Sequence, residues 1–268
     1  MMLCNSMPAV GLAADNQKTA PGSADDKVYY FVGDDAFPPY SLEKKGENEG
    51  SDIDVLQEMA ARAGILIKIE LVPWKRAIEM ARGGYCDAAF SLFYSKERAQ
   101  FVDFITSQPI HKSTFRLFVK KGKEFNFTRI EDIYGKRIGM NTGFFISESF
   151  ASAASSNRII LEEVEGIMMN IMKLDADRLD AFVENDIVTY YHLAEIRDSR
   201  PEIVSLPVPV VEKRGAYLAL SKAAQLKNRG GLIVKIGDAL TAMQKDGTFA
   251  RIIKKYHLDH PDVIRESE

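Results

Sequence analysis

The sequence contains few of the residues that build disulfide-bonded or metal-bound scaffolds. It has two cysteines, Cys4 and Cys86, and four histidines in 268 residues. One pair of cysteines cannot supply a disulfide framework, and the histidines lack the spacing typical of metal ligands. We therefore expect no metal site and no cofactor, and we expect Cys86 to lie on a buried strand as a small apolar side chain.

Long apolar runs and an excess of one charge are also missing. No run reaches the 18 apolar residues that a membrane-spanning helix needs. The formal net charge is only −3 and both signs are interspersed, so the sequence does not indicate a nucleic-acid-binding surface. Apolar residues make up 46% of the chain, enough for the core of one large domain or of two lobes.

The first 26 residues differ in character from the rest. Residues 1–14 are apolar and uncharged and end in small residues, which is typical of the second half of a signal peptide cleaved near Ala13 or Ala14. The basic start of such a peptide is missing, so we expect a remnant, with a disordered N-terminus as the alternative. Residues 15–26 are polar and small, and we expect a disordered lead there.

The stretch from Val72 to Phe104 is the most informative part of the chain. It predicts a helix over residues 75–82, stopped by two glycines, and then a buried strand that starts at Asp87 and runs into Ser91. Residues 95–98 are expected to begin another helix. A strand that ends beside a helix N-terminus favours an anion, because free backbone N–H groups point at it.

Arg98 adds a fixed positive charge at this place. Its planar guanidinium can hold a carboxylate through two parallel hydrogen bonds. The alternative is a solvated helix arginine, paired with Glu97 or Asp103.

Several blocks of sequence carry a family pattern in a fixed order. The residues W-x-R-A, G-x-x-D-A, S-x-E-R and V-D-F follow one another between Trp74 and Phe104. This pattern resembles the bacterial extracellular solute-binding proteins of family 3, which include periplasmic binders of polar amino acids. The resemblance continues in five further blocks, residues 34–40, 51–58, 130–143, 178–186 and 244–256.

The resemblance implies an α/β, two-lobed periplasmic binding protein fold of type II. Each lobe would be a mostly parallel sheet flanked by helices, and two hinge crossovers would join the lobes. We expect residues 27–111 and 214–268 in lobe 1 and residues 112–213 in lobe 2. The alternation of strand and helix from Val28 to Phe90 independently predicts the start of a parallel doubly wound sheet.

The resemblance also implies a ligand site between the lobes. In the family pattern Arg98 and Ser91 take a carboxylate, Phe37 and Trp74 stack on the ligand, and Asn185 occupies the place of an acidic residue that takes an ammonium. The residues predicted to bind ligand are Asp34, Phe37, Tyr40, Trp74, Ser91, Phe93, Arg98, Gly143, Phe144 and Asn185.

Departures from the family pattern narrow the expected ligand. Asn185 is neutral, and strand alternation turns Glu184 and Asp186 to the opposite face. Phe93 replaces a hydroxyl residue, and Phe144-Phe145 replaces a Thr-Thr anion cradle. We expect a carboxylate-bearing ligand with an apolar or aromatic body, or one without a free ammonium, although a standard amino acid stays open. The alternative is that several phenylalanines point into the cores.

These features together predict a monomeric periplasmic receptor that is not an enzyme and delivers its ligand to an ABC-type permease in the inner membrane. Ligand-dependent signalling stays open beside transport. One alternative is a cyclohexadienyl-dehydratase-like enzyme on the same fold, which needs an acid or base in the cleft, with His111 and Glu184 as candidates. Another is a detached sensory module of the kind fused to histidine kinases.

Overall fold

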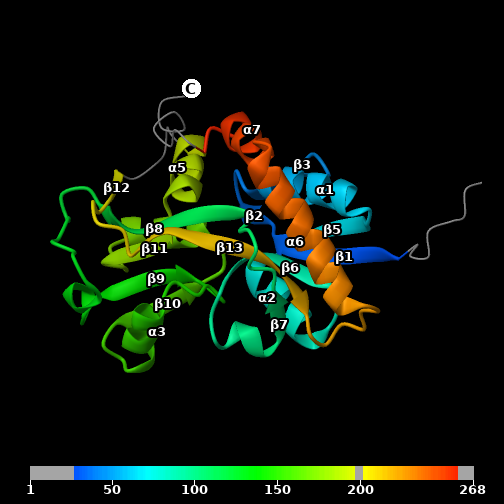
Figure 1. Ribbon diagram of the computed structural model, residues 1–268. Helices are drawn as coiled ribbons and strands as arrows, with labels where there is room; N and C mark the ends of the chain where they lie inside the picture. Colours follow the sequence, from blue (N-terminus) through cyan, green and yellow to red (C-terminus); the bar gives the residue numbers. More distant parts are fainter. Residues whose placement is uncertain (1–26, 197–201, 259–268) are drawn as a thin grey trace, which may run out of the picture.

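The computed structural model describes residues 27–196 and 202–258, which form two α/β lobes along one curved mixed sheet (Figure 1). The predicted fold class is confirmed. The predicted signal-peptide remnant and the polar lead lie outside the described residues.

The first lobe is built on three parallel strands at one end of the sheet, β1 (Val28–Asp34), β5 (Leu66–Val72) and β6 (Ala88–Phe93). Its helices are α1 (Ser51–Ala63), α2 (Trp74–Gly83), α6 (Arg229–Lys245) and α7 (Thr248–Lys255). A small antiparallel sheet leads into α1 and consists of β2 (Ala36–Phe37), β3 (Ser41–Lys44) and β4 (Glu47–Glu49).

The second lobe occupies the other end of the sheet. Its strands are β9 (Arg137–Asn141), β10 (Ile160–Val164), β11 (Ala181–Asn185) and β12 (Ile203–Ser205). Its helices are α3 (Glu148–Ser155), α4 (Ile167–Asp175), α5 (Asp186–Glu195) and the short 3-10 helix η2 (Ile130–Ile133).

Two long strands, β8 (His111–Lys120) and β13 (Val211–Ser221), connect the lobes at the middle of the sheet. They pair antiparallel, and the register shifts between Val211 and Arg214. The short strand β7 (Val102–Phe104) pairs with β13. The predicted lobe boundaries at 111/112 and 213/214 fall on these connecting strands, and they stay a prediction.

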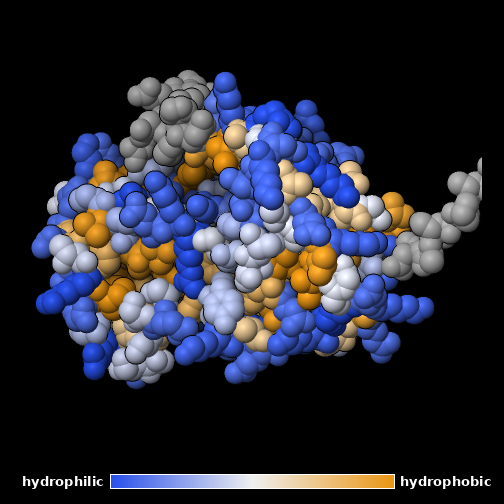
Figure 2. Space-filling model, viewed as in Figure 1, coloured by the Kyte–Doolittle hydropathy of each residue, from blue (hydrophilic) through white to orange (hydrophobic). Residues whose placement is uncertain are grey.

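Buried apolar side chains gather in three clusters. One fills the second lobe and reaches the cleft, and the other two lie on opposite faces of the first lobe's strands. Figure 2 shows that hydrophilic residues cover most of one face, with apolar residues in separate patches. Among the described residues, no helix is long and apolar enough to cross a membrane.

Most predicted elements are present, with boundaries shifted by a few residues. The helix expected from Ser95 is an exception, because the chain there forms only a 3-10 turn, η1 (Arg98–Gln100). The side-chain oxygen of Ser95 accepts a hydrogen bond from the backbone N–H of Arg98 at 3.1 Å, which fixes the start of this turn. Cys86 is buried, as expected, but it lies in the bend before β6 and not on the strand itself.

Candidate functional site

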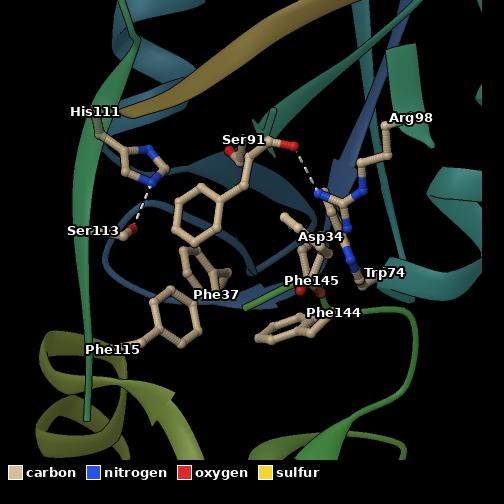
Figure 3. Close-up of a pocket in the computed structure, with 11 residues that line it drawn as sticks. Asp34, Phe37, Trp74, Ser91, Arg98, His111, Ser113, Phe115, Phe144 and Phe145 are labelled. Carbon is tan, nitrogen blue, oxygen red and sulfur yellow. Dashed lines mark hydrogen bonds between the residues drawn. The ribbon is translucent and has the colours of Figure 1, made fainter. Parts of the chain in front are cut away.

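A small cavity lies between the lobes, where β1 and β6 of the first lobe end (Figure 3). Its lining residues are Asp34, Phe37, Trp74, Ser91, Phe93, Arg98, His111, Ser113, Phe115, Phe144 and Phe145. Its volume of about 30 Å³ holds roughly one water molecule. A solute the size of an amino acid therefore fits only after the aromatic rings or the lobes move apart.

Seven of the ten predicted ligand-binding residues line this cavity: Asp34, Phe37, Trp74, Ser91, Phe93, Arg98 and Phe144. They come from the carboxyl ends of parallel strands and the loops that follow, which is where α/β sheets bind their ligands. Their contact with a ligand stays a prediction.

Arg98 lies inside the molecule with only 6% of its surface exposed. Its guanidinium donates to the carbonyl oxygens of Phe93 at 3.2 Å and of Gly143 at 3.0 Å. Burial lowers the pKa of Arg98 to about 10. The alternative of a solvated arginine is wrong, since Glu97 pairs with Arg82 at 3.0 Å instead.

The other partner considered for Arg98 is also engaged elsewhere. Asp103 pairs with Arg229 at 3.2 Å and lies 3.7 Å from Lys222. Among the residues that the structure describes, Arg98 therefore has no ion-pair partner.

Asp34 ends β1 and is the carboxylate of the cavity wall. It is 6% exposed, and one carboxylate oxygen accepts the backbone N–H of Ala36 at 3.2 Å. Burial raises the pKa of Asp34 to about 7. Within the described chain it has no cationic partner, so the cavity holds a buried cation and a buried acid that do not pair with each other.

Aromatic rings fill most of the space between the lobes. Phe144 is central, with ring centroids 6.3 Å from Phe37, 6.2 Å from Trp74 and 6.0 Å from Phe115, all edge-on. Phe93 packs edge-on against Phe115 at 5.4 Å. Phe37, Phe93 and Phe115 also belong to the buried cluster of the second lobe, so these rings serve the core and the cavity together.

Gly143 does not line the cavity, but it connects the lobes. Its carbonyl oxygen accepts from Trp74 Nε1 and from Arg98, each at 3.0 Å. Its φ of +82° is rarely adopted by other residues, and a Cβ there would lie 3.4 Å from the backbone of Lys75.

Asn185 and Tyr40 also lie outside the cavity lining. Asn185 is fully buried, its Oδ1 accepts from the backbone N–H of Val188 at 3.1 Å, and its Nδ2 donates to Ser113 Oγ at 3.0 Å. It therefore caps α5, and its amide is engaged by this cap and by Ser113. Tyr40 is buried behind the wall, with its ring centroid 4.3 Å from His111 and 5.2 Å from Phe37.

The prediction of binding residues missed four cavity residues: His111, Ser113, Phe115 and Phe145. The first three occupy alternate positions of β8 and so share one face of the strand. This alternating spacing is a signal that the sequence contains, but it can be recognised only if the strand is taken to start at His111.

A network of side-chain hydrogen bonds runs behind the cavity wall. His111 Nδ1 lies 2.9 Å from both carboxylate oxygens of Asp52, and His111 Nε2 lies 3.0 Å from Ser113 Oγ. Ser91 Oγ donates to the same carboxylate of Asp52, which is fully buried. Since the single hydroxyl proton of Ser91 is used on Asp52, Ser91 faces the cavity as an acceptor and cannot also donate to a carboxylate.

Glu184 lies close by but does not line the cavity. Its oxygens accept from the backbone N–H of Asn185 at 2.8 Å and from Asn141 Nδ2 at 3.0 Å. Burial raises the pKa of Glu184 to about 8, and the negative charge of Asp34 adds to this.

No group of three or more residues of metal-binding type is found among the described residues. Burial raises the pKa of Cys86 to about 12, so its thiol stays protonated and unreactive.

Comparisons with known proteins agree with this architecture. The sequence profile of the bacterial extracellular solute-binding proteins, family 3, matches residues 30–259. The chain is 25% identical to the "Probable histidine-binding protein" of Neisseria gonorrhoeae, covering 88% of this chain and 85% of that protein. It is 23% identical to the "Arginine-binding extracellular protein ArtP" of Bacillus subtilis, covering 88% of each.

Solved structures share the fold. An ancestral arginine-binding protein bound to arginine aligns with a TM-score of 0.71 at 22% identity, over 85% of this chain and 97% of that one. A histidine kinase sensor domain similar to periplasmic binding proteins aligns with a TM-score of 0.73 at 18% identity, over 86% and 96%. The family match covers most of the chain, and the chain belongs to the bacterial extracellular solute-binding proteins, family 3.

Proposed function

We propose that this protein is a periplasmic receptor that captures a small carboxylate-bearing solute, an amino acid or a close relative, between its lobes. The observation that carries the proposal is the guanidinium of Arg98, which is buried at the cavity and has no ion-pair partner among the described residues. Burying an unpaired charge costs several kcal/mol, and a bound carboxylate offsets that cost.

Asp34 extends the proposal to the amine of the solute. It lies on the same side of the cavity as Arg98 (Figure 3) and likewise lacks a charged partner within the described chain. A solute with neighbouring carboxylate and amine groups complements both residues. Asp34 would then replace Asn185 as the group that receives the amine, which brings a standard amino acid back within the ligand class.

The contacts across the cleft supply a mechanism for closure. Trp74 and Arg98 on the first lobe already meet Gly143 on the second. A solute that binds Arg98 on one side and the turn at Gly143 on the other has more contacts in the closed form than in the open one. Only this difference in affinity can drive closure.

We infer a role in transport, since relatives are named for binding histidine, arginine and cystine and one protein of similar fold is the substrate binding protein of an amino acid ABC transporter. We infer that the receptor acts as a monomer and delivers its solute to an ABC-type permease. The hydrogen bonds from Asp52 to His111 and from His111 to Ser113 follow the same order as the carboxylate, imidazole and hydroxyl of a serine hydrolase triad. However, the oxygen of Ser113 already accepts from Asn185, and no relative named here is an enzyme.

Binding measurements test this function directly. Native mass spectrometry of protein purified without added solute gives the mass of any retained ligand and the oligomeric state. Thermal unfolding with each of the twenty standard L-amino acids, L-cystine and the matching 2-oxo acids then identifies binders, whose affinities are measured by calorimetry. We expect at least one such carboxylate to bind, and a complete absence of binding among them would overturn the proposal.

A further inference from the structure

A second polar region of the cavity lies away from Arg98. His111 and Ser113 project from β8 on one side, Arg98 lies on the other, and the phenylalanine rings lie between them (Figure 3). A solute whose carboxylate binds Arg98 and whose body lies among the rings points its far end at His111 and Ser113.

The hydrogen bonds of this region have defined directions. A carboxylate only accepts, so the Nδ1–H of His111 is donated to Asp52. The amide nitrogen of Asn185 only donates, so Ser113 Oγ accepts from it. If His111 is neutral, its Nε2 lone pair takes the hydroxyl proton of Ser113 at 3.0 Å, and the network donates nothing to the cavity.

One added proton reverses the bond between His111 and Ser113. Nε2–H then donates to Ser113 Oγ, which accepts from both His111 and Asn185. The hydroxyl proton of Ser113 is released from His111 and can be donated into the cavity. The positive charge on the ring is offset by Asp52, which is fully buried and whose other side-chain donor is the neutral hydroxyl of Ser91.

Other groups around His111 complete its environment. The rings of Tyr40 and Phe37 pack beside it, with centroids 4.3 and 6.2 Å away. On the cavity side the charged residues are Asp34 and Arg98. On the outer side His111 borders a crevice whose charged lining residues are Asp186, Glu212, Lys112, Arg116 and Lys213.

We propose that His111 and Ser113 form a second anchor, which holds a hydrogen-bond acceptor at the end of the solute remote from its carboxylate, and that His111 is protonated in this complex. The inference rests on the proposed function and specifies its solute class. Solutes whose far end only donates, such as arginine and lysine, are rejected, and so are solutes with an apolar far end.

The test compares solutes that differ only at the far end. L-glutamine and L-glutamate carry an acceptor there, L-norleucine carries none, and L-arginine carries donors only. We expect the tightest binder among the standard L-amino acids and L-cystine to have a distal acceptor and to exceed L-norleucine by about tenfold, the effect of one good hydrogen bond. A tightest binder without such an acceptor overturns the inference.

A matched pair of variants locates the anchor. Ser113→Ala should weaken the tightest binder by about tenfold and leave L-norleucine within twofold. Thr114→Ala, one residue along β8 and with its side chain on the other face of the strand, should change neither. Equal losses for both solutes in Ser113→Ala would assign Ser113 to packing alone and overturn the anchor.

A measurement on the unmodified protein does not depend on the folding of a variant. The ¹⁵N chemical shifts of the His111 ring in the complex with the tightest binder should show both nitrogens protonated, and a neutral ring overturns the inference. If Arg98→Ala abolishes binding but the Ser113→Ala comparison and the ¹⁵N measurement both fail, the proposed function stands and only the second anchor is lost. If no carboxylate binds, both fall.

Discussion

Arg98 on the first lobe donates a hydrogen bond of 3.0 Å to the carbonyl oxygen of Gly143 on the second lobe. The same oxygen accepts from Trp74 Nε1. When a solute carboxylate binds here, Arg98 replaces a single bond to a neutral carbonyl with two parallel bonds to an opposite charge, which is the stronger interaction. The cation thus holds the lobes together and is also the group with most to gain from a bound anion.

Replacing Arg98 should remove most of the affinity. We expect Arg98→Ala to weaken binding of a carboxylate solute by about 2–5 kcal/mol, because the partner charge is then left buried and unpaired. Titration calorimetry with the best-binding amino acid measures this. Arg82→Ala, on an exposed ion pair with Glu97, is the matched control and should leave affinity unchanged. A change below threefold in Arg98→Ala excludes it as the anchor.

Asp34 predicts a pH dependence that separates amino acids from their 2-oxo acids. A bound amine favours the ionised carboxylate, so the contribution of Asp34 to affinity is full above its pKa of about 7 and is lost below it. The loss approaches about tenfold per pH unit. Asp34→Asn should abolish this dependence and weaken amines only, whereas the exposed Asp35→Asn should not. An equal pH dependence for the 2-oxo acid would contradict the assignment.

Trp74 should report closure by fluorescence. It is the only tryptophan, it is 8% exposed, and its indole N–H is donated to Gly143 across the cleft. Opening the lobes breaks this bond and hydrates the ring, so emission should move to longer wavelength when the lobes separate and return when a solute binds. Spectra with and without the best binder check this. An emission maximum that is the same in both spectra would place Trp74 outside the moving interface.

Glu184 should make folding stability fall as pH rises. Its folded pKa of about 8 lies above its ordinary value of 4.5, so the stabilising contribution is full below pH 4.5 and is lost as the pH approaches 8. Glu184→Gln keeps a neutral side chain, and its advantage over the native protein should grow with pH to several kcal/mol. Denaturant unfolding at pH 5 and pH 8 measures this, with the exposed Glu47→Gln as control. A constant difference between the two pH values would refute it.

Asn185 should matter more for stability than for binding. Asn185→Ala removes the cap of α5 and the partner of Ser113, at a cost of about 1–2 kcal/mol in unfolding free energy. Asn228→Ala removes only the cap of α6 and should cost less. Calorimetry should find the affinity of Asn185→Ala for an amino acid within threefold of the native value. A loss that is confined to amine-bearing solutes would restore the role that the family pattern implies.

The sequence predicts many helices and strands well, because hydrophobic periodicity and glycine stops are local signals, whereas the two-lobed fold was predicted from the family resemblance. The pattern around α2 locates the helix to within one residue at each end. The S-x-E-R block likewise places Arg98 in the site, and its burial agrees. The start of β8 is harder to locate from the sequence, since His111 and Lys112 carry no strong strand preference.

Side-chain partners are harder to predict, because they depend on residues far apart in the chain. Asp52 and His111 are separated by 59 positions, and neither has a local pattern that names the other. Asn185 ends β11, and its amide caps α5 and donates to Ser113 instead of facing the cavity. In neither case does the sequence identify the bonding partner.

The aromatic rings that fill the cleft affect which solutes the protein can bind. With about 30 Å³ in the aromatic-lined cavity, a solute must displace ring edges in order to bind there. The dispersion contacts that the solute makes replace those that the rings made with one another, so an apolar body by itself yields little net affinity. Glycine and alanine offer too few atoms to compensate for parting the rings. We therefore expect shape and the placement of polar ends to decide which solutes are retained, and glycine and alanine to be retained poorly.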